Sequence, residues 1–211
     1  MPLAERSGLI RPLTSFVLRT APRACSSWRR QGVQIGVVVN LSARGLTQDF
    51  VDEVVRLLEL TRVPPYLLTL EITENSVMSD PTRAIEVLSR LHAIGVRLSL
   101  DDFGTGYSSL SYLKALPVHE VKIDRSFVAT MLDREDDAQI VRSIIDLGGN
   151  LALDVVPEGV EDAATWSRLA ELGCDFVQGY HLSRPLPVDE LLDWYRDYES
   201  RRAAAGVLRV G

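Results

Sequence analysis

The stretch that decides the fold of this chain is Arg97-Leu98-Ser99-Leu100-Asp101-Asp102-Phe103-Gly104-Thr105-Gly106-Tyr107-Ser108-Ser109-Leu110. The alternating apolar residues Val96, Leu98 and Leu100 predict a strand, and this strand runs directly into the carboxylates of Asp101 and Asp102. Adjacent carboxylates repel each other, so their position at the end of a strand favours a bound cation. A solvated turn with a helix N-cap is the alternative. The strand and the glycine-containing turn together favour the metal site.

Composition indicates a soluble globular protein that forms one α/β domain over residues 1–198, with a frayed tail at 199–211. The net charge of −6 argues against a DNA-binding groove. No apolar run approaches the roughly eighteen residues that span a bilayer, and the N-terminus does not resemble a signal peptide. Cys25 and Cys174 lack the spacing of a zinc site or disulfide framework, and two free thiols fit a cytoplasmic location.

Strands and helices are expected to alternate along the whole chain. The six predicted strands lie at 35–40, 67–74, 96–101, 118–124, 151–156 and 176–180. Predicted helices include one from Thr14 towards Trp28 that Pro22 kinks or interrupts, and one that Asp80 caps and Gly95 ends. Alternation allows a doubly wound open sheet or a (β/α) barrel. Because a polar residue closes every strand, the barrel is favoured, in an incomplete TIM-like form with about six of its eight strands.

The polar residues at the strand ends suit hard divalent cations. The candidate ligands are Asn40, Glu71, Asp101, Asp102 and Glu158. Their oxygens would hold two Mg²⁺ or Mn²⁺ ions, with Asp101 bridging them, and such a pair can clamp a phosphodiester and activate water. Lys122 would add positive charge near the water or the phosphate. For each residue alone, a helix cap, a turn or a surface ion pair is an equally good explanation, but six in register favour the metal site.

Several motifs at these positions resemble the EAL domain family, whose members are phosphodiesterases that open cyclic di-GMP to linear pGpG. The matching segments are Pro2–Ile10, Asn40-Leu41-Ser42, Leu70–Glu74, Asp101–Leu110, Lys122-Ile123-Asp124, Glu158-Gly159-Val160-Glu161, Gln178-Gly179-Tyr180 and Arg184-Pro185-Leu186-Pro187. The resemblance runs from about Pro2 to Tyr195. It implies a metal-dependent hydrolase acting on cyclic di-GMP, with an EAL-type barrel as its fold.

The resemblance also assigns a role to each site residue. One cation would be bound by Asn40, Glu71 and Asp101, and the second by Asp101, Asp102 and Glu158. The catalytic residues would be Lys122, Glu158 and Asp101, while Gln178 and Asp124 would order the site or contact substrate. Glu74 would brace the loop Phe103–Leu110, which includes Gly104, Thr105 and Gly106 and which in the family links the metal site to a dimer interface. A homodimer is therefore expected, with a fused or partner sensor or cyclase domain as a further possibility.

Two departures from the family pattern affect these expectations. The family's Glu-Ala-Leu motif belongs to a strand that would precede Met1, so we expect the first two strands to be missing and the activity to be impaired. The alternative is a catalytically inactive EAL-like module that binds cyclic di-GMP or a protein partner. The second departure is Pro157, which replaces the family's usual alanine; proline lacks a backbone donor and is expected to shift Glu158.

Overall fold

The structure, a computed structural model, describes residues 9–106, 110–174 and 176–205. The predicted start of the N-terminal helical segment, residues 107–109 of the predicted dimer loop and the end of the predicted tail lie outside the described residues. The contacts of the chain divide it into two units. The first comprises Met1–Asp101 and Gly106–His119, and the second comprises Asp102–Thr105 and Glu120–Gly211.

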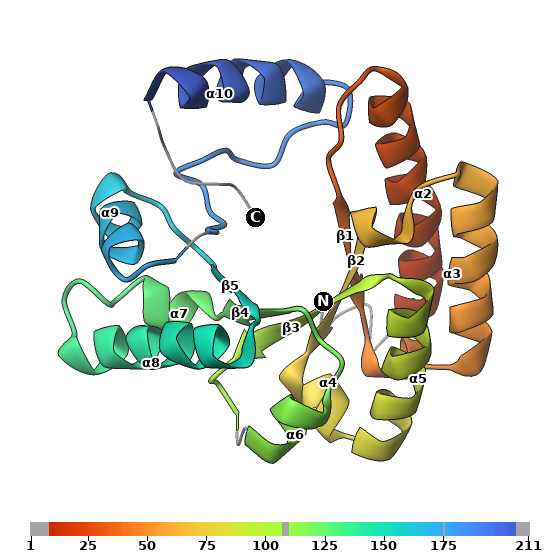
Figure 1. The fold of residues 1–211 in the computed structure, drawn as a ribbon, viewed down its shortest axis with the longest axis horizontal. Coiled ribbons are helices and arrows are strands. Elements are labelled where there is room, and N and C mark those ends of the chain that lie inside the picture. Colours follow the sequence, from red (N-terminus) through yellow and green to blue (C-terminus); the bar gives the residue numbers. More distant parts are fainter. Residues whose placement is uncertain (1–8, 107–109, 175, 206–211) are drawn as a thin grey trace. The chain divides into compact units, whose positions relative to one another are not determined.

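Helices and strands alternate as the sequence predicts (Figure 1). The strands are β1 (Val37–Leu41), β2 (Leu68–Thr73), β3 (Arg97–Phe103), β4 (Glu120–Ile123) and β5 (Asp154–Pro157). The helices are α2 (Ile10–Arg30), α3 (Gln48–Thr61), α4 (Glu74–Met78), α5 (Pro81–Ile94), α6 (Leu110–Ala115), α7 (Arg125–Val128), α8 (Glu135–Leu151), α9 (Ala163–Glu171) and α10 (Leu191–Ala205), with 3₁₀ turns η1 (Ala43–Gly45) and η2 (Pro65–Leu67). The described residues therefore form an α/β fold with five strands.

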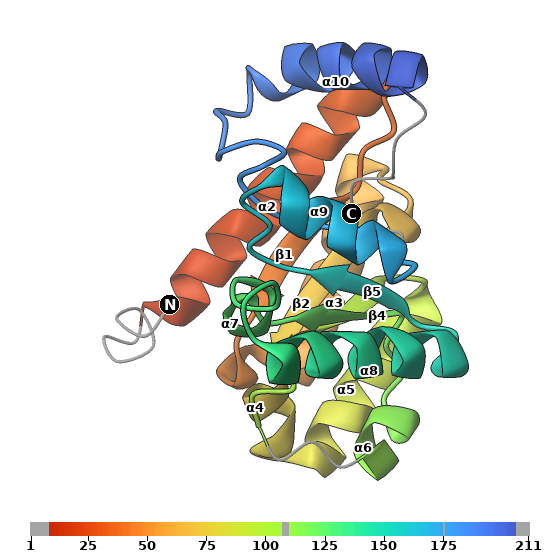
Figure 2. The same ribbon diagram turned by 90° about the vertical axis from the view of Figure 1, so that its left-hand side faces the viewer.

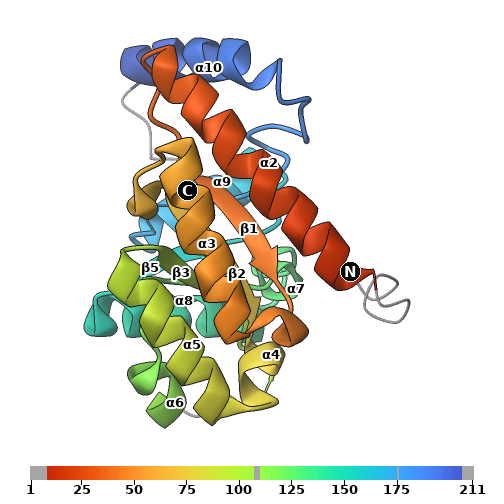
Figure 3. The same ribbon diagram turned by 90° about the vertical axis from the view of Figure 1, so that its right-hand side faces the viewer.

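The first unit holds a parallel sheet of β1, β2 and β3, covered on one face by α2, α3 and α5 (Figure 3). Leu68, Leu70 and Ile72 of β2 are fully or almost fully buried, and they form the core together with apolar residues of the helices. In β1, burial alternates: Val37, Val39 and Leu41 are buried, whereas Val38 and Asn40 are exposed. This period of two separates a helix-covered face of β1 from a face that carries the polar residue.

The second unit holds the parallel pair β4 and β5, with α8 lying along both strands (Figure 2). Gly148 of α8 allows this close approach, because a Cβ at this position would lie 2.2 Å from Cγ2 of Val155 in β5. Helix α10 continues to Ala205, so residues 199–205 of the predicted tail are helical.

One predicted strand is wrong, and one of the two alternatives predicted for Pro22 is excluded. The predicted strand at 176–180 is reduced to a single bridge between Glu158 and Gln178, because Gly159, with φ of 73°, turns the backbone away directly after β5. Helix α2 is not interrupted: it begins at Ile10 and continues through the buried Pro22 to Arg30.

Candidate functional site

Three predicted ligands lie in the first unit, on one face of its sheet. Asn40 of β1 is the register partner of Glu71 of β2. Glu71 is in register with Ser99 of β3, and Asp101 lies two residues beyond Ser99, on the same face. Register partners on neighbouring strands lie about 5 Å apart. The structure therefore gathers Asn40, Glu71 and Asp101 at the carboxyl ends of three consecutive parallel strands.

The surroundings of these groups fit a hard cation. Glu71 is only 5% exposed, and Oδ1 of Asp101 is buried without a hydrogen-bond partner among the described residues. A buried carboxylate oxygen that lacks a partner is costly unless a cation or water satisfies it. Carboxylate and amide oxygens are the ligands that Mg²⁺ and Mn²⁺ prefer. The donor set of the first unit therefore fits a divalent cation.

The turn after Asp101 has an unusual backbone. Asp102 has a φ of 57° and Gly104 a φ of 94°, both in the left-handed region. The Asp102 carbonyl accepts hydrogen bonds from the Thr105 backbone N–H at 3.3 Å and from its hydroxyl at 2.8 Å. The predicted turn is therefore present. The left-handed φ at Asp102 breaks the alternation of faces that would otherwise separate adjacent strand residues.

Glu74, the predicted brace of the loop after β3, lies beside Gly106. Its side chain is 5% exposed, and a Cβ at position 106 would lie 3.0 Å from Glu74 Oε1. Thr73 caps the short helix that begins at Glu74 by accepting a hydrogen bond from the Ser76 N–H. Glycine is thus the residue that allows the loop to approach this carboxylate so closely.

In the second unit, Lys122 and Glu158 form a largely buried ion pair. Lys122 Nζ contacts Glu158 Oε1, and the lysine side chain is 5% exposed. A buried ammonium requires a counter-charge nearby because its desolvation is expensive. The structure brings together these two predicted catalytic residues, from the third residue of β4 and from the position directly after β5.

Backbone hydrogen bonds fix Glu158 despite the preceding proline. The Glu158 N–H donates to the Ile123 carbonyl at 3.0 Å, and the Gln178 N–H donates to the Pro157 carbonyl at 2.9 Å. Pro157 therefore uses only its acceptor, and the ladder continues at the next residue. The Gln178 carbonyl in turn accepts a hydrogen bond from the Val160 N–H at 3.1 Å. These backbone hydrogen bonds therefore also hold the predicted site residue Gln178 in place.

Two glycines that were not predicted as site residues allow the segments of Glu158 and Gln178 to approach closely enough for these hydrogen bonds. A Cβ at Gly159 would lie 2.7 Å from Cβ of Arg125, and a Cβ at Gly179 would lie 2.1 Å from the Val160 carbonyl oxygen. Both glycines stand in the quoted motifs next to Glu158 and Gln178, so the signal was present in the sequence. The role of these glycines becomes clear only from the contact between the segments of Glu158 and Gln178, which lie 20 residues apart in the sequence.

A cavity of about 510 Å³ opens beside Glu158 within the second unit. Gln178, Tyr180, Arg184 and Trp194 also line it. The Arg184 guanidinium lies 5.0 Å from the centre of the Tyr180 ring, within the range of a cation–π contact. The cavity thus combines a carboxylate, an arginine and aromatic surface. Neither the arginine nor these aromatic residues were predicted from the sequence as site residues.

Asp124, predicted to order the site, caps a helix. Its carboxylate accepts a hydrogen bond from the Ser126 N–H at 2.9 Å and closes the first turn of α7. His119 has a packing role: its ring stacks on His92 with centroids 4.9 Å apart, and its Nδ1 accepts from the Leu98 N–H.

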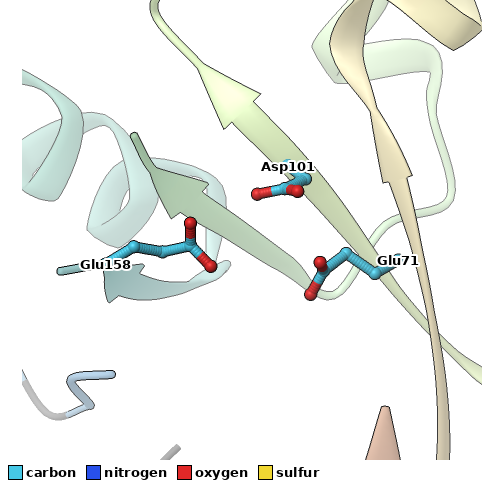
Figure 4. A group of neighbouring side chains, drawn as sticks. All are labelled: Glu71, Asp101 and Glu158. Carbon is cyan, nitrogen blue, oxygen red and sulfur yellow. The ribbon is translucent and has the colours of Figure 1, made fainter. Parts of the chain in front are cut away.

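Figure 4 draws three of the predicted metal ligands with the elements that carry them. Glu71 comes from β2, Asp101 from β3 and Glu158 from the residue after β5. The first two belong to the first unit and the third to the second unit. Among the described helices, none is both long enough and apolar enough to cross a membrane.

Parallel strands that alternate with helices and end in acidic side chains define the class of α/β proteins with reactive groups at the carboxyl ends of their strands. A family model described as "EAL domain" matches residues 1–185. The chain belongs to the EAL domain family, and the predicted fold class is thereby confirmed.

Relatives and solved structures agree with this membership. The chain is 44% identical over 194 residues to the bifunctional diguanylate cyclase/cyclic di-GMP phosphodiesterase MucR of Pseudomonas aeruginosa. This match covers 91% of this chain and 28% of MucR. It is 42% identical over 198 residues to the cyclic di-GMP phosphodiesterase NbdA of the same species, and this second match covers 93% of this chain and 25% of NbdA. The chain thus spans about a quarter of the length of these curated relatives.

A solved structure, the PaMucR phosphodiesterase in complex with c-di-GMP, matches with a TM-score of 0.86 at 44% identity. The match covers 90% of this chain and 78% of that chain.

Proposed function

We propose that this chain is a cyclic di-GMP phosphodiesterase domain that hydrolyses its substrate to linear pGpG. The observation that carries the proposal is the arrangement of Asn40, Glu71 and Asp101 on one face of a parallel sheet, at its carboxyl end. The names of MucR and NbdA support the substrate and the reaction, since both include cyclic di-GMP phosphodiesterase.

Two divalent cations, Mg²⁺ or Mn²⁺, are proposed as the cofactors. Asn40, Glu71 and Asp101 would hold one, and Asp101, Asp102 and Glu158 the other. The buried, unpartnered Oδ1 of Asp101 supports this assignment. When bound, such cations lower the pKa of a coordinated water and neutralise charge on a phosphodiester.

Lys122 is proposed as the cationic catalytic residue. Lys122 is buried, so water screens its charge weakly, and an anion beside it would be attracted more strongly than at the surface. Its contact with Glu158 holds the ammonium at the end of β4. Lys122 would thereby orient the attacking water or stabilise negative charge that develops on the phosphate.

The cavity beside Glu158 is proposed to receive part of the substrate. Arg184 offers a planar cation suited to phosphate, and Tyr180 and Trp194 offer rings on which a guanine base can stack. Gln178, exposed at the same cavity, can donate and accept hydrogen bonds with a base or with water. We retain Asp124 as a site-ordering residue that acts through the start of α7.

A homodimer, coupled to the site through Glu74 and the loop from Phe103 to Gly106, is proposed as the working assembly. The close approach of Gly106 to the buried Glu74 carboxylate supports this coupling, because a change at one would displace the other. A fused or separate sensor or cyclase domain is proposed as the source of regulation, in keeping with the bifunctional name of MucR.

The test is incubation of the purified chain with cyclic di-GMP and Mn²⁺ or Mg²⁺, with pGpG measured by chromatography. We expect turnover that Asp101→Asn, Glu158→Gln and Lys122→Met each lower by at least about 100-fold, because each removes a ligand or a charge from the reacting centre. Asp146→Asn, a change of an exposed aspartate on α8, is the matched control and should leave turnover unchanged.

Two results would contradict the proposal. If cyclic di-GMP binds in calorimetry but no pGpG forms with either cation, the chain is the alternative, a non-catalytic binding module. If the three site variants turn over substrate as fast as Asp146→Asn does, the chemistry lies elsewhere in the chain.

A further inference from the structure

A second pocket lies in the first unit, between the C-terminal ends of α2 and α3, and it is strongly basic. Its volume is about 870 Å³, and its lining includes Arg23, Arg29, Arg30 and Arg62, which we call the arginine pocket. We propose that the arginine pocket binds a small molecule with several phosphate groups, of the nucleoside polyphosphate class, as a regulatory ligand distinct from the substrate.

Among the described residues, no carboxylate neutralises the four guanidinium groups. None of them forms an ion pair with an acidic side chain in the part of the chain that the structure describes. Arg29 donates to the Arg62 carbonyl at 2.8 Å, and Arg30 donates to the Ser26 hydroxyl at 3.3 Å. These neutral acceptors leave the positive charges in place. Such a cluster is notable in a chain whose net charge is −6.

Capping of the two helices does not account for four arginines. Helix α2 ends at Arg30 and α3 ends at Thr61, and each C-terminus carries an effective charge of about −0.5. Two helix ends therefore offset about one positive charge of four, which leaves a surplus of about three. A di- or triphosphate carries a charge of matching size, and the guanidinium fork suits phosphate oxygens.

The shape and the remaining lining favour a nucleoside over inorganic phosphate. The volume lies within the range of roughly 300–1,000 Å³ that is typical of small-molecule sites. Leu57 and Leu60 contribute an apolar wall, and Leu60 is 83% exposed. An exposed leucine beside arginines can pack against the flat face of a base.

The arginine pocket is separate from the candidate metal ligands of the same unit. The helix ends that frame it lead into the N-terminal ends of β1 and β2, at Val37 and Leu68. Asn40, Glu71 and Asp101 lie towards the carboxyl ends of the strands. A ligand in the arginine pocket would therefore act at the opposite end of this sheet.

Calorimetry with ATP, GTP and inorganic tripolyphosphate, without divalent cations, tests the proposal. We expect the nucleoside triphosphates to bind more tightly than tripolyphosphate, and the affinity to fall as salt is raised. The double variant Arg23→Glu/Arg30→Glu should weaken binding by at least about tenfold, since two phosphate-binding cations become anions. Both arginines are exposed, so the variant is expected to fold, and a thermal melt verifies this.

Arg56→Glu is the matched control, because Arg56 is exposed on α3 but does not line the pocket. Equal loss of affinity in Arg56→Glu and in the double variant would overturn the proposal, as would absence of binding by all three probes. Tripolyphosphate binding as tightly as ATP would overturn the nucleoside assignment. Binding only to vesicles with anionic phospholipid would assign the arginines to a membrane surface instead. If the double variant does not fold, Arg23→Glu alone replaces it with the same expected direction.

Discussion

The backbone of Asp102 adopts a left-handed conformation. Its φ of 57° is uncommon for a residue other than glycine and costs on the order of 1–3 kcal/mol. Aspartate tolerates this region better than most residues, and the two hydrogen bonds from Thr105 to its carbonyl hold the turn. Such strain persists where the surroundings impose it, typically at functional sites. Here the strained turn sets the backbone position of Asp102, whose carboxylate is a proposed ligand of the second cation.

Asp162 provides a pH-dependent contribution to stability at the start of α9. The backbone N–H and then the hydroxyl of Thr165 donate to its carboxylate and lower its pKa below the ordinary value of 3.8. Because the folded pKa is depressed, the stabilisation is present above pH 3.8 and is lost as the pH falls through the folded pKa. We expect Asp162→Ala to lower the melting temperature at pH 7, and the difference from wild type to shrink as the pH falls below 3.8.

Thermal melts at these pH values measure the effect, with Asp146→Ala on α8 as the control for loss of an exposed aspartate. A difference that stays constant down to pH 2 would show that the cap acts without its charge.

Helix boundaries could be predicted where a local chemical signal sets them. Asp80 accepts a hydrogen bond from the Arg83 N–H, and Gly95 ends α5 with a φ of 94°, both as expected. The reduction of the predicted strand at 176–180 to a single bridge could not be foreseen, because its pairing depends on the turn that Gly159 imposes on another segment. Local propensity therefore gives caps and stops, while pairing is decided by contacts distant in sequence.

Two adjacent glycines of α8 should respond in opposite ways to alanine. At Gly148, a Cβ would lie 2.2 Å from Val155 Cγ2 and 3.3 Å from the Leu153 carbonyl oxygen, whereas nothing lies within 4 Å of a Cβ at Gly149. Gly148→Ala should therefore destabilise the protein by about 1–3 kcal/mol through overpacking. Gly149→Ala should stabilise it by about 0.5–1 kcal/mol through helix propensity.

Urea denaturation of the two variants and wild type measures both effects in one experiment. Gly149→Ala is the matched control for the gain in helix propensity that both substitutions share. Equal stabilities of the two variants would show that α8 does not approach β5 as closely as the structure has it.

At the scale of the whole molecule, the sequence predicts which metal ligands lie together at the strand ends better than it predicts ion pairs and pockets. Alternating strands and helices require parallel strands, whose carboxyl ends share an edge, and Asn40, Glu71 and Asp101 follow from that alone. The ion pair of Lys122 with Glu158 needs the β4–β5 register, in which Lys122 faces Val156 and Pro157 follows. The arginine pocket joins helices whose arginines stand more than 30 residues apart, and no motif connects them.

The proposed metal site makes a prediction about stability that is independent of catalysis. Because a cation that binds only the folded chain stabilises it, Mn²⁺ should contribute about 2.7 kcal/mol at a concentration of 100 times its Kd. We expect Mn²⁺ to raise the melting temperature of wild type, and Glu71→Gln and Glu158→Gln each to reduce this increase. If both carboxylates serve one pair of ions, the double variant should lose less than the sum of the two single losses, since the first substitution already weakens the shared site. Glu59→Gln, an exposed change on α3, should keep the full increase. Strictly additive losses would instead mean that Glu71 and Glu158 do not serve a shared pair of ions, and the two-cation proposal would then have to be abandoned.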